Sequence, residues 1–529
     1  MNSRLLANFW HTVRRNMSTI VTIFLSCTIV SIWTIFRFLS QPINFDLIGQ
    51  QLLARHWLSG YTEGVLTAPT NYIFKIFVFY MPAEIFNLDP TLFLILSTLL
   101  INILTIIGIY YILYRILKKF SIDPGMYFNM MFLWISTIAG SVFWIQFSNS
   151  RNLEIVAGLG IIYLGIRCYE GKSLVSLIPF VIYLALVFFS DPMQIYVSGT
   201  ILAAYIILDS LFLDRRNKKS AIKVLIVILI AFLLSLAIQL FARKFFGIVF
   251  FKVGSLNQSL DVLNNLSPAI KQTIRNILDI FSGTEEMGRW RRRLNNVFTL
   301  YLFAMTVWLY IRYKLYSHNR KLMVLIVLAL VFPVAIYFAS GQPLLPGTSR
   351  YLIMLFPGLI MLIATLEAVP KQSLIAIFTV VILVNSYGLI RSLAGVSNNR
   401  LEGIDVLERR YDYIVGSDFS YGYADMSTAI PAEYFFGRDS DKVIFPLDCR
   451  DNKLYKVNLF FDKGVFDKIE DRDKKTSIIV GKELIRGPLS DCGVEDIKNQ
   501  LGEWSDIEEL GDGDLALIYP SQVMTKLTF

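Results

Sequence analysis

One carboxylate, Asp46, follows the first long apolar run of the chain, in the segment Pro42-Ile43-Asn44-Phe45-Asp46. A carboxylate beside apolar walls at a membrane–water boundary is well placed to act as a general base on a lipid-borne substrate. Asp46 also precedes the apolar-periodic run Leu47–Leu58, so a helix N-cap is the alternative interpretation. The pattern therefore predicts either a catalytic base or a cap at this position.

The turn Ser148-Asn149-Ser150-Arg151-Asn152-Leu153-Glu154 separates two apolar runs and carries an arginine and a carboxylate. Arg151 and Glu154 are three residues apart, so they share one face if a helix begins there. Guanidinium groups bind sugars and phosphates well, whereas a cap with an interfacial salt bridge is the alternative. We expect Arg151, Asn152 and Glu154 to line a substrate cavity.

Two further polar residues are candidates for the same cavity. Asp191 is the only charge in the turn Ser190-Asp191-Pro192, although turn chemistry explains this motif at least as well. His56 lies in the run Leu47–Leu58 with no second His or Cys nearby, so its spacing predicts no zinc site. We assign no metal ligand, although carboxylates and a bound phosphate together are compatible with one divalent ion.

Arginines also gather beside the later apolar runs, and arginine is suited to bidentate contacts with phosphate. For Arg289–Arg293 the alternative is contact with lipid headgroups. For Arg350 the alternative is that its long side chain reaches from the membrane to the interface. The candidate phosphate ligands are Arg289, Arg291, Arg292, Arg293, and Arg350 in Gly347-Thr348-Ser349-Arg350-Tyr351.

The composition indicates which elements must hold these residues. The chain of 529 residues is 55% hydrophobic and only 17% charged. A soluble domain is about 45–50% apolar and about 25% charged, and its core stops growing near 250–300 residues. A polytopic membrane protein is therefore expected, and the composition argues against a soluble enzyme, a DNA-binding regulator and a disordered protein.

The net charge of +9 divides into two opposite parts. Residues 1–390 hold 32 Lys and Arg against 15 Asp and Glu, whereas residues 391–529 hold 18 against 26. Cationic loops orient membrane proteins, so the basic part does not indicate nucleic-acid binding. We expect a transmembrane domain over 1–390, with outer loops 40–88 and 243–297, and a separate domain over 391–529.

Apolar runs long enough to approach a bilayer core predict about eleven spans. Lysine and arginine concentrate in alternate loops, which places the N-terminus inside and residues 391–529 outside a cytoplasmic membrane. In the first outer loop, Leu47–Leu58 and Tyr72–Tyr80 are predicted to form interfacial helices. The expected spans are 17–39, 90–114, 126–147, 153–167, 173–190, 193–212, 221–242, 298–312, 321–340, 350–366 and 372–390.

The tail shows the composition of an ordinary exported α/β domain. Strands are expected at 413–416, 442–446, 456–461, 477–481 and 515–519, short helices at 482–485, 494–501 and 507–510, and a loop at 421–425. Cys449 and Cys492 could form a disulfide in an oxidising compartment, or remain two thiols.

Together these features resemble the GT-C superfamily of membrane glycosyltransferases, which includes protein O-mannosyltransferases and lipid A aminoarabinose transferases. The resemblance rests on Asp46 in a first outer loop with interfacial helices, the 151–154 and 190–192 turns, and Ser349-Arg350-Tyr351-Leu352 opening a late span. In protein O-mannosyltransferases the loop shows an Asp-Glu pair, whereas here Asp46 is followed by Leu47.

The resemblance implies a sugar donor linked to a polyprenyl phosphate, reached from the outer leaflet, and an inverting transfer to an acceptor hydroxyl of unknown identity. It implies that Asp46 is the base and that the arginines bind the donor phosphate. Two alternatives are an O-antigen polymerase or ligase, and a lipid or sugar transporter or flippase. Transport is disfavoured because no acidic residue falls in the middle of a span.

Overall fold

The structure is a computed structural model, and by contacts the chain divides into two compact units. The helical unit comprises Met1–Arg37, Thr98–Leu236 and Lys252–Ser397, and the mixed unit comprises Phe38–Ser97, Ala237–Phe251 and Asn398–Phe529. The mixed unit thus joins the expected first outer loop to the expected tail domain. The residues described are 17–40, 45–60, 66–67, 75–142, 152–171, 177–214, 217–246, 249–250, 262, 264–282, 289–313, 319–341, 352, 355–368, 372–394, 402–419, 421–437, 442–450, 452–457, 475–481, 489, 492–511 and 513–527.

Every one of the eleven predicted apolar runs contains a helix, because long apolar runs satisfy their backbone hydrogen bonds internally. Among the described residues, six helices are long and apolar enough to cross a membrane, fewer than the eleven expected. The helices and helical turns are α2 (Met17–Ser40), α6 (Pro90–Lys119), α7 (Met126–Val142), α8 (Asn152–Glu170), α9 (Leu177–Ser190), η2 (Ile195–Gly199), α10 (Thr200–Leu208), η3 (Asp209–Leu213), α11 (Lys218–Phe246), α13 (Leu266–Ser282), α14 (Arg289–Tyr313), α15 (Arg320–Ala339), α16 (Leu355–Ala364), η9 (Thr365–Ala368) and α17 (Gln372–Ala394).

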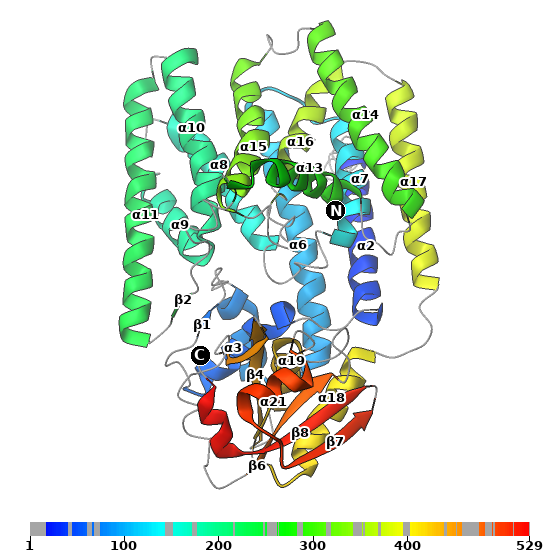
Figure 1. Ribbon diagram of the computed structural model, residues 1–529. Coiled ribbons are helices and arrows are strands. Elements are labelled where there is room, and N and C mark those ends of the chain that lie inside the picture. The colour runs from blue at the N-terminus through cyan, green and yellow to red at the C-terminus, as the bar shows by residue number, and fades with distance from the viewer. Residues whose placement is uncertain are drawn as a thin grey trace, which may run out of the picture. The chain divides into compact units, whose positions relative to one another are not determined.

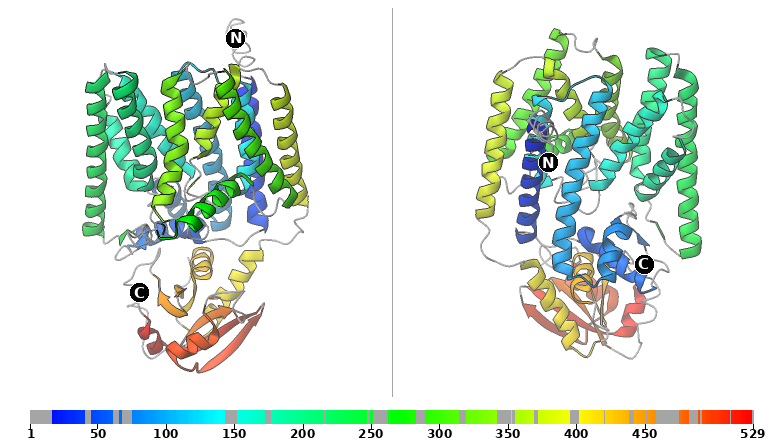
Figure 2. Two further views of the ribbon diagram at one scale, coloured as in Figure 1. Left: turned by 45° about the horizontal axis from the view of Figure 1, so that its top comes forward. Right: turned by 180° about the vertical axis from the view of Figure 1, so that it is seen from behind.

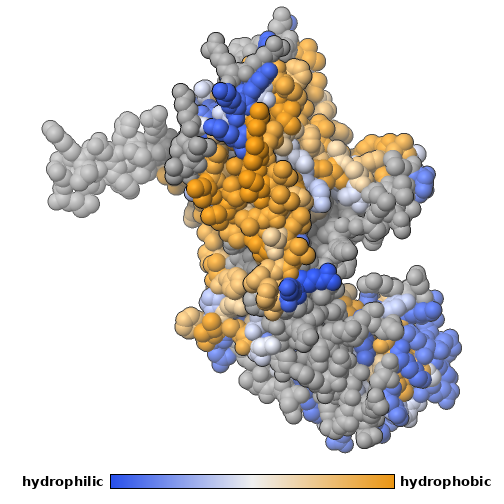
Figure 3. All heavy atoms as spheres, turned by 90° about the vertical axis from the view of Figure 1, so that its left-hand side faces the viewer, coloured by the Kyte–Doolittle hydropathy of each residue, from blue (hydrophilic) through white to orange (hydrophobic). Residues whose placement is uncertain are grey.

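The outside of the helical unit is apolar. Figure 3 shows a broad hydrophobic surface over the side of this unit that faces the viewer. Helix α11 contributes large exposed side chains such as Leu229 and Leu233, with 56% and 55% of their surface exposed. A contiguous apolar surface of this kind is typical of contact with lipid, as in a polytopic membrane protein.

Inside the helical unit, α13 runs across the long helices instead of along them (Figures 1 and 2). Trp134 of α7 is fully buried, and its ring lies 6.3 Å from that of Phe281 in α13. It also lies 5.0 Å from Phe298 of α14 and 6.5 Å from Phe378 of α17, centroid to centroid. One aromatic cluster therefore joins the crossing helix to three of the long ones.

The mixed unit is built on a six-stranded sheet in the order β5-β4-β3-β6-β8-β7, in which β3 is parallel to β4 and β6 and the other pairs are antiparallel. Alternate residues point to opposite faces: Ile444 and Ile479 pack with α18, whereas Phe445 and Val480 belong to the core with α21. Its elements are α3 (Phe45–Leu58), β1 (Leu66–Thr67), η1 (Ile76–Tyr80), α5 (Met81–Ile85), β2 (Val249–Phe250), α18 (Glu402–Gly416), β3 (Tyr421–Asp425), α19 (Met426–Phe436), β4 (Val443–Arg450), β5 (Lys453–Lys456), β6 (Lys475–Gly481), α21 (Val494–Leu501), β7 (Asp506–Gly511), β8 (Asp514–Pro520) and η11 (Ser521–Lys526).

Three predictions for the tail are wrong. Residues 413–416 end helix α18 and do not form a strand, because an amphipathic pattern begins eleven residues earlier. Residues 421–425 form the central strand β3, where both tyrosines are fully buried, and do not form a loop. Residues 507–510 lie in the edge strand β7 and not in a helix. The predicted helix 482–485 lies outside the described residues.

The two tail cysteines are joined. Cys449 of β4 and Cys492, which precedes α21, form a disulfide with a Cα–Cα distance of 5.8 Å. Both belong to the core on the α21 face of the sheet. The disulfide therefore ties the parallel strand β4 to the segment that leads into this covering helix.

Candidate functional site

Helix α3 contains Asp46, the predicted base. Asp46 is its second residue, and the side chain of Asp46 lies outside the described residues. Ile48, Leu52 and Leu53 are at most 1% exposed and belong to the core of the mixed unit. Because α3 is anchored by this apolar face, the position of its first turn depends on the packing of the whole unit.

Two adjacent glutamines follow Asp46 on the same helix. Gln50 and Gln51 are 2% and 1% exposed, and Gln50 lies one turn beyond Asp46. The Oε1 atom of Gln50 and both amide atoms of Gln51 make no hydrogen bond within the structure. An unsatisfied buried amide costs about 1–3 kcal/mol, so a ligand rich in hydroxyl groups would relieve a real penalty here.

A buried lysine lies in the neighbouring segment. Lys75 is fully buried and immediately precedes η1, which packs on α3. Burying an ammonium group is costly unless an opposite charge or several acceptors accompany it. Sequence analysis missed Lys75 because it lies within the apolar run Tyr72–Tyr80; a single cation in such a run was the available signal.

Arg55, in the last turn of α3, reaches two other helices. Its Nε donates to Glu84 Oε2 of α5 at 3.1 Å. Its Nη1 and Nη2 donate to the backbone carbonyl oxygens of Glu433 and Tyr434 in α19, at 3.0 and 2.8 Å. Its neighbour His56, a predicted cavity residue, is half-buried. Sequence analysis missed Arg55, whose main partners lie nearly 380 residues away.

The carboxyl group of Glu433 is buried beside this arginine. Burial raises the pKa of Glu433 to about 7, although Arg55 and the backbone N–H of Ile444 act in the opposite direction. Its Oε2 has no hydrogen-bond partner. Glu433 therefore changes charge near neutral pH.

Helix α14 begins with the predicted arginine cluster. Arg289 and Arg293 are exposed, and Arg292 forms a 3.7 Å ion pair with Asp279 of α13. Arg291 is only 7% exposed, and its Nε and Nη1 have no hydrogen-bond partner. Of the four arginines, Arg291 is thus the one whose buried donors are left for a ligand.

The position of Arg291 is set by α17. Gly388 lies directly beneath its guanidinium group, since a Cβ atom there would be 1.8 Å from Nη1. One turn further along α14, Asn295 exchanges hydrogen bonds with Asn385 of α17, at 3.0 and 3.3 Å. This buried amide pair fixes α14 against α17 and holds Arg291 over the glycine.

The remaining predicted cavity residues have different surroundings. Asp191 is 1% exposed; its carboxylate accepts from the backbone N–H of Met193 at 3.1 Å and from Gln194 Nε2 at 2.9 Å, as a turn would require. Asn152 and Glu154 lie in the first turn of α8, but their side chains are outside the described residues, as are Arg151 and Arg350 entirely.

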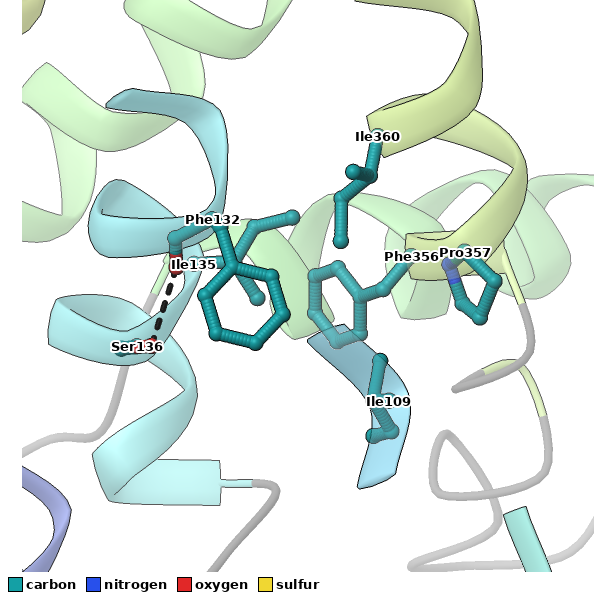
Figure 4. Close-up of a pocket in the computed structure, with 7 residues that line it drawn as sticks. All are labelled: Ile109, Phe132, Ile135, Ser136, Phe356, Pro357 and Ile360. Carbon is teal, nitrogen blue, oxygen red and sulfur yellow. Dashed lines mark hydrogen bonds between the residues drawn. The ribbon is translucent and has the colours of Figure 1, made fainter. Parts of the chain in front are cut away.

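A small cavity lies between α6, α7 and α16 of the helical unit (Figure 4). Six of its seven lining residues are apolar, and the seventh, Ser136, donates its hydroxyl to Phe132 O at 2.9 Å. Its volume of about 20 Å³ is enough for roughly one water molecule. Its size and lining do not suit a sugar.

The candidate residues divide between the two units. Asp46, Gln50, His56 and Lys75 belong to the mixed unit, whereas Asp191 and the α14 arginines belong to the helical unit. Among the described residues, no group of three His, Cys, Asp or Glu side chains is arranged to hold a metal ion.

Comparison with known proteins found a likeness in fold. Neither the protein-family models nor the curated proteins contain a match to this sequence. The crystal structure of ArnT from Cupriavidus metallidurans bound to undecaprenyl phosphate matches with a TM-score of 0.50 at 10% identity, over 95% of this chain and 98% of ArnT. The apo structure of ArnT matches equally, over 96% and 99%. ArnT is an aminoarabinose transferase of the GT-C class, and the chain therefore has a GT-C-like fold, that of a polytopic membrane protein with a C-terminal domain.

Proposed function

We propose that the chain is a membrane glycosyltransferase that moves a sugar from a polyprenyl-phosphate donor to an acceptor hydroxyl. The observation that carries the proposal is the likeness in fold, over nearly the whole of both chains, to ArnT bound to undecaprenyl phosphate. The candidate residues add independent support, because a base, buried cations and unsatisfied amides are the groups that this reaction needs.

Each group has a role in the proposed transfer. Asp46 takes the proton of the acceptor hydroxyl, whose oxygen attacks the anomeric carbon. The bond between that carbon and the phosphate oxygen breaks, the configuration inverts, and the lipid phosphate leaves. Arg291 offsets the charge on the leaving phosphate, because it is a buried cation whose Nε and Nη1 donors have no hydrogen-bond partner. Arg289, Arg292, Arg293 and Arg350 would supply further cations near the donor.

The sugar would be recognised by amides and by the predicted cavity residues. Gln50 and Gln51 offer buried donors and acceptors to sugar hydroxyl groups. Arg151, Asn152, Glu154, Asp191 and His56 are proposed to complete the cavity.

We also propose that the chain resides in a cytoplasmic membrane, with its N-terminus inside and the C-terminal domain outside. The excess of Lys and Arg in alternate loops supports this orientation. The Cys449–Cys492 disulfide supports it independently, since disulfides persist in oxidising compartments.

The test is transfer of labelled sugar from a polyprenyl-phosphate donor by membranes that carry the chain, with Asp46→Asn as the variant. Asp89→Asn is the matched control, because Asp89 caps α6 by accepting from the Leu92 N–H and asparagine caps helices equally well. We expect Asp46→Asn to lose about 10²- to 10⁴-fold in rate and the control to keep wild-type activity. Full activity in Asp46→Asn at wild-type abundance would refute the assigned base.

A further inference from the structure

The Arg55 side chain joins three helices of the mixed unit through one guanidinium group. Its three hydrogen bonds reach Glu84 in α5 and two consecutive carbonyl groups in α19, while Arg55 itself belongs to α3. The guanidinium carbon also lies 5.2 Å from the centre of the Tyr434 ring. A planar fork of five donors suits this geometry, which a single ammonium group does not reproduce.

The two carbonyl groups lie at the C-terminal end of α19. Glu433 and Tyr434 belong to its last turn, where a helix runs out of backbone N–H donors of its own. The Glu433 carbonyl accepts the N–H of Gly437 as well as Nη1 of Arg55. A cation at a helix C-terminus is also favoured by the helix dipole. Arg55 therefore serves α19 as a C-terminal cap supplied by another segment.

Burial makes this contact strong. The side chains of Arg55 and Glu84 are 12% and 10% exposed, and Tyr434 is 1% exposed. Water competes little for such groups, so removal of one partner from the contact is costly. The first-loop helix is thus fastened to the C-terminal domain by a contact that solvent does not replace.

Arg55, which makes this contact, lies on the same helix as Asp46. Arg55 lies nine positions after Asp46 on the same helix, a rise of roughly 14 Å at 1.5 Å per residue. A helix of this length moves nearly as a rigid rod, so a tilt allowed at one end appears at the other. Misplacement of a reacting group by about 1 Å can cost about 10²-fold in rate.

We propose that Arg55 is a positioning residue, through which the C-terminal domain holds α3 in the orientation that catalysis needs. The domain would then be part of the transfer machinery. This inference rests on the proposed function, because it takes Asp46 as the group that is positioned.

The test compares Arg55→Met with Arg410→Met in the full chain. Arg410 of α18 is a matched control: its side chain is 15% exposed, and it donates to Asp514 and Thr428, both at 2.7 Å, neither of which belongs to α3. We expect Arg55→Met to lower kcat for glycosyl transfer at least tenfold with little change in the KM for the donor. Arg410→Met should keep kcat while it lowers the melting temperature, and Arg55→Lys should recover part of the lost rate.

Hydrogen exchange gives a readout that does not depend on activity. Arg55→Met should speed amide exchange in α3 more than in strands β6 and β8, whereas Arg410→Met should not affect α3 selectively. Wild-type kcat and unchanged α3 exchange in Arg55→Met would overturn the inference, and so would an equal loss of kcat in both variants. If Asp46→Asn is fully active, the assignment of Asp46 as the base fails instead; if the wild-type chain transfers no sugar, the proposed function fails. In both cases the exchange result still shows whether Arg55 holds α3.

Discussion

Two arginines with little exposed surface, one in each compact unit, differ in what surrounds their donors. Arg55 in the mixed unit directs its Nε, Nη1 and Nη2 atoms to a carboxylate and two carbonyl groups. Arg291 in the helical unit is 7% exposed, but its Nε and Nη1 atoms have no hydrogen-bond partner. Folded proteins rarely leave buried donors unsatisfied, so each exception requires an explanation.

The difference separates a structural arginine from a ligand-binding one. A guanidinium whose donors are satisfied within the chain lowers the free energy of the folded state. One whose donors are unsatisfied raises that free energy until an anion arrives, and the lipid phosphate of the proposed donor is such an anion. Stability and lipid binding should therefore respond in opposite ways at the two positions.

The largest expected effect is on stability. Arg55→Met removes one partner of a buried ionic contact, a change that costs about 3–5 kcal/mol and lowers the melting temperature by about 6–20 °C. Arg291→Met removes an unsatisfied charge and should leave the melting temperature unchanged or raised. Thermal unfolding of the two purified variants in one detergent checks this. Equal loss of melting temperature in both would contradict the assignment of Arg55 as structural and Arg291 as ligand-binding.

Glu433→Gln sharpens the comparison, because it keeps the carbonyl group that Arg55 binds and removes only the carboxylate. The pKa of Glu433 is raised from 4.5 to about 7, so the folded state binds the proton more tightly and wild-type stability falls as pH rises through this window. Glu433→Gln should match wild type near pH 5 and exceed it at pH 8, by melting temperature. If it instead destabilises as Arg55→Met does, the carboxylate and not the carbonyl is what holds Arg55.

The smallest expected effect is on lipid affinity. Loss of charge-assisted hydrogen bonds worth about 1.5–3 kcal/mol should weaken binding of polyprenyl phosphate to Arg291→Met by about 10- to 150-fold. Arg312→Met, which removes an exposed arginine from the last turn of the same helix, is the control and should bind as wild type does. Native mass spectrometry with polyprenyl phosphate would measure both, and unchanged affinity in Arg291→Met would remove it from the phosphate site.

The helices could be predicted from the sequence, whereas the residues of the candidate site could be predicted only in part. A run of about 20 apolar residues has few alternatives to a helix, and each of the eleven runs contains one. Short tail segments carry less information: Tyr-Gly-Tyr at 421–423 resembles a loop until neighbours bury both faces of β3. Asp46 and Arg291 are singled out by residue type and position near apolar runs. Arg55 and Glu433 are not, because their importance arises from a contact between distant segments.

Donor choice tests the central claim most directly. Purified chain would be offered equal amounts of a sugar on polyprenyl monophosphate and on polyprenyl pyrophosphate, with acceptor-bearing membranes, and consumption of each donor would be followed by mass spectrometry. The account predicts that the monophosphate donor is consumed, that free polyprenyl phosphate accumulates, and that Asp46→Asn abolishes both. Consumption of the pyrophosphate donor alone, or movement of intact donor across the membrane without release of its sugar, would contradict it.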